Sequence, residues 1–150
     1  MNHETTDLTP NTLARLVVDA LERTAFVLAD PCDDPEQLPP ADTFARIEFR
    51  GPTVGCVELL ASRSFARNLA ASILGADASD VSDLQSEEAL RELANIVGGS
   101  VITALGGSDC RFSLGLPQLG RAEAAGDDTA CILDAEGARL EVHCHRARAA

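Results

Sequence analysis

The sequence predicts an α+β fold, in which a mostly antiparallel β-sheet is covered by helices and one helix is long and central. Three observations predict it. Apolar residues recur at helical spacing in three segments, they alternate with polar residues at strand spacing in others, and short turns join neighbouring strands. The expected order is helix, two strands, two helices and three strands, and 150 residues are the size of a single domain, 1–150.

Capping residues and turns mark the ends of these elements. Thr9 offers an N-cap hydroxyl before Pro10, which suits the first helical position. Ser62 is expected to cap the second helix and Gly75 to end it. The expected elements are a helix from Pro10, a short strand starting at 26–28, a loop to about residue 41, strands at 44–50 and 54–61, a helix up to residue 74, an acidic linker at 76–83, a long helix at 84–105, and strands at 110–116, 130–133 and 139–145, the last two joined by a turn at Glu136 and Gly137.

The composition excludes several classes of function. All 12 basic residues are arginine, so the chain has no lysine for a P-loop, a Schiff base or a general base. A net charge of −12 and the lack of Trp and Tyr argue against nucleic acid as a partner, and the charge argues against anionic membranes. Residues 1–9 are polar and no apolar run could span a bilayer, so we expect a cytoplasmic protein.

The cysteines and histidines are candidates for disulfide, metal or nucleophilic sites. Five cysteines, an odd number and widely spread, predict reduced and mostly buried thiols instead of a disulfide framework. His143 and His145 lie on one face of the last strand, with Glu141 on the same side and Cys144 on the other. This set suggests a metal patch or a cysteine nucleophile pair. Because the ligand set is incomplete, we expect an exposed strand face and no metal bound by this chain.

The outward face of the long helix carries the most specific pattern. At about 100° per residue, Glu88, Glu92, Asn95 and Gly99 fall opposite the apolar stripe. Two glutamates one turn apart, a mid-helix asparagine and the pair Gly98-Gly99 all disfavour a helix, with each glycine costing about 1 kcal/mol relative to alanine. On a rigid helix face, the carboxylate can pair with a cation of a partner and the carboxamide can hold a water by hydrogen bonds. The glycines leave room for another protein to approach.

A plain solvated face is the alternative interpretation of this helix, because charged residues are the normal outside of an amphipathic helix. The acidic segment 77–92 has two interpretations as well. It either steers a cationic partner surface toward the helix or serves only as a solubilising linker.

The stretch 88–99 resembles the signature helix of the CheC/CheX/FliY family of chemotaxis phosphatases. The family pattern is Asp or Ser, Glu four residues later, Asn three residues after that, and a proline downstream. Glu92 and Asn95 match the two functional positions, and Pro117 resembles the downstream proline. The preceding hairpin and helix and the single motif resemble the CheX branch over about residues 10–146. Glu88 departs from the pattern, which has Asp or Ser there, and Pro117 comes slightly early.

The resemblance implies a phosphatase for the phosphorylated aspartate of a CheY-like receiver domain. In this family the glutamate, here Glu92, pairs with the receiver's active-site lysine, and the asparagine, here Asn95, orients the attacking water. The receiver supplies Mg²⁺, so no cofactor is expected on this chain. Gly98, Gly99 and Pro117, together with Glu88, are expected to contact the partner.

Two further expectations concern partners. The departure at Glu88 suggests, as an alternative, a non-catalytic adaptor that binds a receiver or signalling protein through the same helix. Relatives of the CheX type are typically dimers, and we expect a homodimer formed through the edge of the last strand, 139–145.

Overall fold

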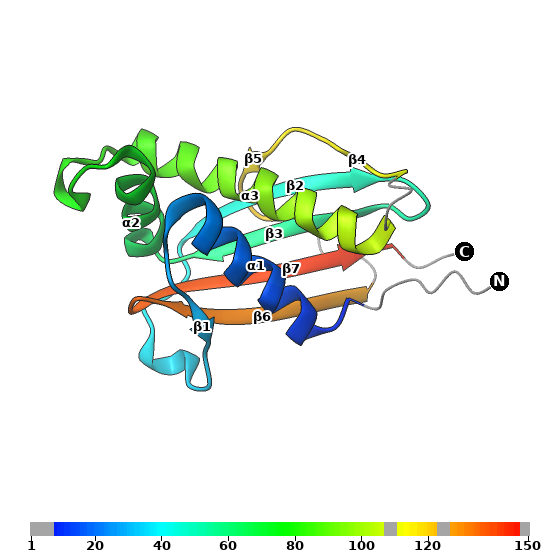
Figure 1. The fold of residues 1–150 in the computed structure, drawn as a ribbon, viewed down its shortest axis with the longest axis horizontal. Helices are drawn as coiled ribbons and strands as arrows, with labels where there is room; N and C mark the ends of the chain where they lie inside the picture. The colour runs from blue at the N-terminus through cyan, green and yellow to red at the C-terminus, as the bar shows by residue number, and fades with distance from the viewer. Residues whose placement is uncertain (1–7, 107–110, 123–126, 148–150) are drawn as a thin grey trace.

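Helices cover one face of an antiparallel sheet in the computed structural model, which describes residues 8–106, 111–122 and 127–147 (Figure 1). Helices α1 and α3 lie across that face, and α2 lies at one end of α3. The strand order is β1-β6-β7-β3-β2-β4, with β5 also paired to β2, which confirms the α+β prediction. The elements are α1 (Pro10–Ala25), β1 (Asp30–Pro31), η1 (Pro35–Gln37), β2 (Thr43–Arg50), β3 (Gly55–Ala61), α2 (Arg63–Leu74), η2 (Ala78–Asp80), α3 (Asp83–Gly106), β4 (Ser113–Leu114), β5 (Gln118–Leu119), β6 (Asp127–Ala135) and β7 (Ala138–Arg146).

The predicted helix caps form as expected. The Thr9 hydroxyl accepts a hydrogen bond from the backbone N–H of Thr12 at 3.1 Å, and the Ser62 hydroxyl accepts one from that of Phe65 at 3.3 Å. One cap was missed by the sequence analysis. Ser82 and Gln85 bond each other's backbone N–H groups at 3.1 and 2.9 Å, a reciprocal capping box that fixes the start of α3.

Two short strands differ from their predicted positions. The strand expected at 26–28 is wrong, because Phe26 has a left-handed backbone (φ 55°) that ends α1, and β1 follows at Asp30–Pro31. The strand expected at 110–116 is wrong as one continuous element. Two-residue strands, β4 and β5, pair with different parts of β2 instead. Residue 110 lies outside the described residues.

The last two strands form the predicted hairpin. Glu136 (φ 56°) and Gly137 (φ 89°) make a two-residue turn with two positive φ angles, the geometry that suits the twist of a hairpin. However, β7 pairs with β6 on one side and β3 on the other. The prediction that β7 offers a free edge for a dimer is therefore wrong, because both of its edges are already hydrogen-bonded.

The proline-rich loop before β2 is tied to the far end of the chain. Arg139, at the start of β7, donates hydrogen bonds to the backbone carbonyls of Pro35 and Pro39. Two side-chain N–H groups of one arginine thereby hold a segment that forms little secondary structure of its own.

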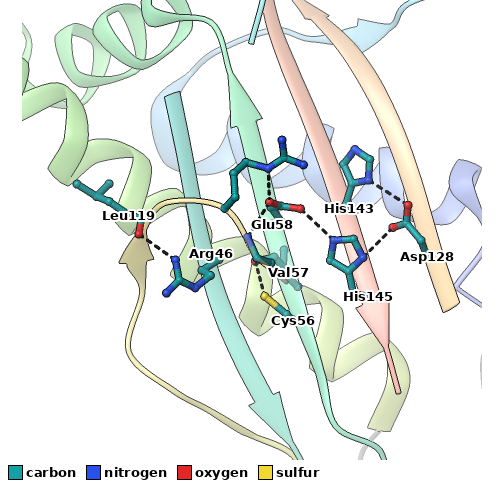
Figure 2. Close-up of polar contacts among 10 residues, drawn as sticks. Arg46, Cys56, Val57, Glu58, Leu119, Asp128, His143 and His145 are labelled. Atoms are coloured by element: carbon teal, nitrogen blue, oxygen red, sulfur yellow. Dashed lines mark hydrogen bonds and ion pairs between the residues drawn. The ribbon is translucent and has the colours of Figure 1, made fainter. Parts of the chain in front are cut away.

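The two faces of the sheet differ in chemistry. Alternate residues of the central strands face the helices and form an apolar core with α1, α2 and α3. The opposite face carries polar side chains, among them Arg46, Glu58 and His145 (Figure 2). Among the described residues, none of the helices combines the length and apolar composition needed to cross a membrane.

Helix α3 approaches β2 closely at Gly98. A Cβ at this position would lie 2.8 Å from Cγ2 of Ile47 and 3.1 Å from Cδ2 of Leu114. At Gly99, no atom beyond the chain neighbours and the adjoining helix backbone lies within 4 Å of the corresponding point. The two neighbouring glycines therefore have different surroundings, one packed against the sheet and one open.

Glu58 is a buried carboxylate on the polar face. It is 1% exposed, and two residues that follow β5, Arg121 and Ala122, contact it. Its Oε2 accepts hydrogen bonds from Arg121 at 2.7 Å and the backbone N–H of Ala122 at 2.9 Å, while Oε1 lies 2.9 Å from Nε2 of His145. Burial by itself would raise the pKa of this carboxyl, but these hydrogen bonds outweigh burial and hold the pKa below its ordinary 4.5.

We expect Gly98→Ala to be about 1–3 kcal/mol less stable than Gly99→Ala. Both variants gain the same helix propensity, about 1 kcal/mol, but only the first forces a methyl group against Ile47. Urea unfolding of the two proteins measures the difference. Equal stability of the two variants would contradict the close packing of α3 on β2.

We expect Glu58→Gln to lower the unfolding free energy at pH 7 and to matter progressively less below pH 4.5. The pKa of Glu58 is lower in the folded protein than in the unfolded chain, so its ionised form stabilises the folded state. This stabilisation is complete above the pKa of the unfolded chain and is lost as the pH falls through the pKa of the folded protein. The groups facing it are His145, Arg121 and, across the strand pair, Arg46. Thermal unfolding from pH 3 to 7 measures the effect.

The matched control is Glu48→Gln, an exposed carboxylate two residues along β2 from Arg46. This variant should follow the wild type across the pH range. If Glu58→Gln shifts the unfolding temperature equally at every pH, the ionised state of Glu58 does not contribute.

Candidate functional site

The outward face of α3 presents the residues that the sequence singled out. Glu88, Glu92 and Asn95 are exposed, which confirms their predicted orientation. Packing on the core fixes the position of this helix, because four residues on its opposite side are 2% exposed or less: Leu90, Leu93, Val97 and Val101. Three residues along a helix advance about 4.5 Å, so Glu92 and Asn95 form neighbouring polar groups on one side.

The Glu92 and Asn95 side chains are available for a partner. Within 8–106, 111–122 and 127–147, no hydrogen bond or ion pair engages either of them. An unpaired carboxylate binds a cation, and an unpaired carboxamide both donates and accepts hydrogen bonds, for example to a water. A rigid buried helix holding both meets the requirement that reactive groups be fixed in position.

A hollow of about 240 Å³ lies between α2 and α3 beside the two glutamates. Apolar side chains form much of its rim, and Ile73 and Leu74 are 47% and 53% exposed. The lining residues are Ala70, Ile73, Leu74, Gln85, Glu88, Ala89 and Glu92. Carboxylates beside exposed apolar side chains are a mixed surface typical of protein contacts.

The two glycines differ from the expectation that both lie on the outward face. Gly99 has open space around it, but Gly98 is buried against Ile47 and Leu114. The outward placement of Gly98 is therefore wrong, because this glycine admits the sheet and not a partner. Pro117 lies in the link between β4 and β5, two strands that contact α3.

The histidine pair has surroundings that the sequence did not reveal. His143 Nδ1 lies 3.1 Å from Asp128 Oδ2, and His145 Nδ1 lies 3.4 Å from Asp128 Oδ1 (Figure 2). His145 Nε2 also contacts Glu58. Asp128 and Glu58 come from β6 and β3, the strands on either side of β7, so only the strand register could have identified them.

The expected exposure of this histidine pair is wrong for His145, which is 7% exposed and lies between Glu58 and Asp128. Glu141, expected to join the pair, forms an ion pair with Arg139 at 3.3 Å instead.

The thiols do not form a nucleophilic site. Burial raises the pKa of Cys131 to about 11 and that of Cys144 to about 12. Burial and the nearby Glu58 raise the pKa of Cys56 to about 11. These thiols stay protonated at neutral pH and are poor nucleophiles. The four cysteines within the described residues are free, as predicted, and Cys110 lies outside those residues.

Known proteins share both the sequence pattern and the fold. Residues 43–127 match the family model of the chemotaxis phosphatase CheX. CheX from Vibrio vulnificus has a TM-score of 0.73 at 15% identity, covering 91% of this chain and 94% of that chain. A chain of the CheX–CheY–BeF3–Mg²⁺ complex from Borrelia burgdorferi has a TM-score of 0.66 at 15% identity, covering 91% and 96%.

FliY from Thermotoga maritima has a TM-score of 0.59 at 11% identity and covers 97% of this chain and 91% of that chain. No protein with a curated description matches the sequence. The structural likeness shows the fold, and the family model covers more than half of the chain. This chain therefore belongs to the CheC/CheX/FliY family of chemotaxis phosphatases, on its CheX branch.

Proposed function

We propose that this protein is a phosphatase that accelerates hydrolysis of the aspartyl phosphate on a CheY-like receiver domain. The observation that carries the proposal is the pair Glu92 and Asn95, exposed and unengaged by any described residue on a helix that belongs to this family's fold. One structural relative was solved together with CheY, BeF3 and Mg²⁺, and that relative supports a receiver as the partner.

The proposed chemistry needs little from this chain beyond position. Water attacks the phosphorus of the acyl phosphate, the bond between phosphorus and the aspartate oxygen breaks, and inorganic phosphate leaves. An acyl phosphate is already activated, so placing the water in line is the main task. Asn95 orients that water, Glu92 pairs with the receiver's lysine, and the Mg²⁺ belongs to the receiver.

The surroundings of the pair support docking of another protein. Gly99 leaves the helix surface bare one turn beyond Asn95. On the other side, Ile73 and Leu74 offer exposed apolar area beside Glu88 and Glu92. We assign Glu88 and Pro117 to the edge of the same docking surface.

The alternative is a non-catalytic adaptor that binds a receiver through this surface. Glu88 favours it, because the family pattern has Asp or Ser at that position. An adaptor would bind the receiver without changing the lifetime of its phosphate.

We expect Asn95→Ala to lower kcat by about 100-fold, because misplacing the reacting groups by about 1 Å costs a rate factor of this size. Its KM should change little, since the amide acts mainly in the transition state. Glu92→Gln should instead raise KM, and this effect should shrink at high salt, because a screened charge pair contributes less to binding. Dephosphorylation of a cognate receiver with Mg²⁺, at two salt concentrations, measures both.

Glu22→Gln is the control, because Glu22 is an equally exposed carboxylate on α1. It should match the wild type. Circular dichroism should show that all variants remain folded, since these side chains face away from the core. If the protein binds a receiver but leaves its phosphate lifetime unchanged, the adaptor hypothesis replaces the phosphatase. If it neither binds nor dephosphorylates any receiver, both hypotheses are refuted.

The homodimer and the cytoplasmic location remain predictions. The edge of β7 does not provide a dimer contact, so a dimer would have to use another surface. We expect light scattering at micromolar concentration to give twice the 15.8 kDa subunit mass. A single subunit mass would reject the dimer.

A further inference from the structure

We propose that Asp128, His143 and His145 form a binding site for a divalent late transition-metal ion, with Zn²⁺ the best match, on the polar face of the sheet. This site is separate from the α3 surface, which lies on the helix side of the sheet (Figures 1 and 2). The inference goes beyond the proposed phosphatase and does not depend on it.

The strand register assembles the three side chains. Asp128 on β6 is directly opposite His145 on β7, and His143 lies two residues along β7 on the same face. One potential ligand atom from each residue lies within 4.8 Å of the others. Strands are rigid elements, so this arrangement is set by the sheet and not by a loop.

The distances between these atoms suit a tetrahedral ion. Zinc bonds of about 2.0–2.1 Å at tetrahedral angles place neighbouring ligand atoms about 3.3 Å apart. Nδ1 of His143 lies 3.1 Å from Oδ2 of Asp128 and Nδ1 of His145 lies 3.4 Å from Oδ1, so each nitrogen has this spacing to one of the two carboxylate oxygens. Two imidazoles and one carboxylate are a donor set that suits zinc and other late transition metals better than Mg²⁺.

The two carboxylates that flank His145 are the strongest argument for a cation. Its Nε2 faces Glu58 at 2.9 Å, and its Nδ1 faces Asp128 at 3.4 Å. A neutral imidazole has a single N–H and so can satisfy only one of these two carboxylates, whereas a positive charge on the ring, from a second proton or from a bound metal ion, satisfies both. A metal ion on Nδ1 satisfies Asp128 and leaves the N–H on Nε2 for Glu58.

Glu58 then has the role of an outer partner that orients a ligating histidine. Metal-binding histidines commonly donate their second N–H to a carboxylate, which fixes the tautomer and the ring direction. Glu58 is itself held by Arg121 and the backbone of Ala122, so it cannot easily turn away.

The site is open on one side. The His145 side chain is 8% exposed and that of Asp128 is 43% exposed. An ion can therefore enter from the Asp128 side, and water can complete its coordination. Binding would join β6 to β7 at the end of the hairpin far from its turn.

The test is a calorimetric titration of the metal-free full-length chain with ZnCl₂, together with thermal unfolding with and without Zn²⁺. We expect one Zn²⁺ per chain and a rise in unfolding temperature, because an ion that binds only the folded state stabilises it. MgCl₂ should do neither. Co²⁺ in place of Zn²⁺ should give the visible absorption of a tetrahedral site.

His143→Ala and Asp128→Asn should each weaken Zn²⁺ binding at least 10-fold and abolish the thermal shift. Both residues are more exposed than His145, so these variants avoid leaving Glu58 without its partner. Glu141→Gln is the matched control, a carboxylate on the same strand face outside the cluster, and it should bind Zn²⁺ like the wild type.

Absence of Zn²⁺ binding to the wild type would overturn the proposal. Unchanged binding by both variants would also overturn it, because the ion would then occupy another site, such as a cysteine. Neither result would affect the phosphatase, whose measurement uses the receiver's phosphate and not this ion.

Discussion

The close approach of α3 to β2 at Gly98 is the constraint on which the rest of the molecule depends. A side chain at this position would meet Ile47, a fully buried strand residue in a close-packed interior. Without the side chain, the helix lies directly on the sheet and buries its apolar side from Leu90 to Val101. The rotation of the helix about its axis is then fixed, and so is the direction in which Glu92 and Asn95 point.

The sheet separates two kinds of chemistry. On its helix side, apolar side chains form the core, and Glu92 and Asn95 project outward from α3 into solvent. On its other side, ionisable side chains from β3, β6 and β7 meet at Glu58 and His145, where Arg121 and Ala122 contact Glu58. Each side acts through groups that the other side does not touch, so a change in one need not alter the other.

Much of the fold and the outward placement of Glu92 and Asn95 could be predicted because their signals are local. Capping residues, helical periodicity and the two-residue turn at Glu136 are each read within a few positions. The Glu92 and Asn95 pair was visible because both residues lie on one helix. The role of Gly98 was not, because nothing nearby in sequence shows that Ile47 packs against it.

The remaining misses share this physical cause. The cluster of Asp128, His145 and Glu58 is built across three strands, and the pairing of those strands is set by the complete sheet. The location of β7 also follows from topology. It lies inside the sheet because β3 leaves one edge free for β7, and β6 then pairs with the other edge of β7. Alternation within β7 shows which face is buried but not which strands lie beside it.

The pairing of β1 and its loop with the last hairpin has a consequence for synthesis of the chain. Pro31 of β1 pairs with Leu133, and the carbonyls of Pro35 and Pro39 are bonded by Arg139, about a hundred residues later. During translation, β1 and its loop have no partners until the β6–β7 hairpin has left the ribosome, and β3 has one open edge. The side of α1 that contacts β6 and β7 is exposed to solvent over that interval, whereas α3 precedes the hairpin and can already cover β2. Such contacts between distant segments slow folding and leave apolar surface exposed until the last strands pair.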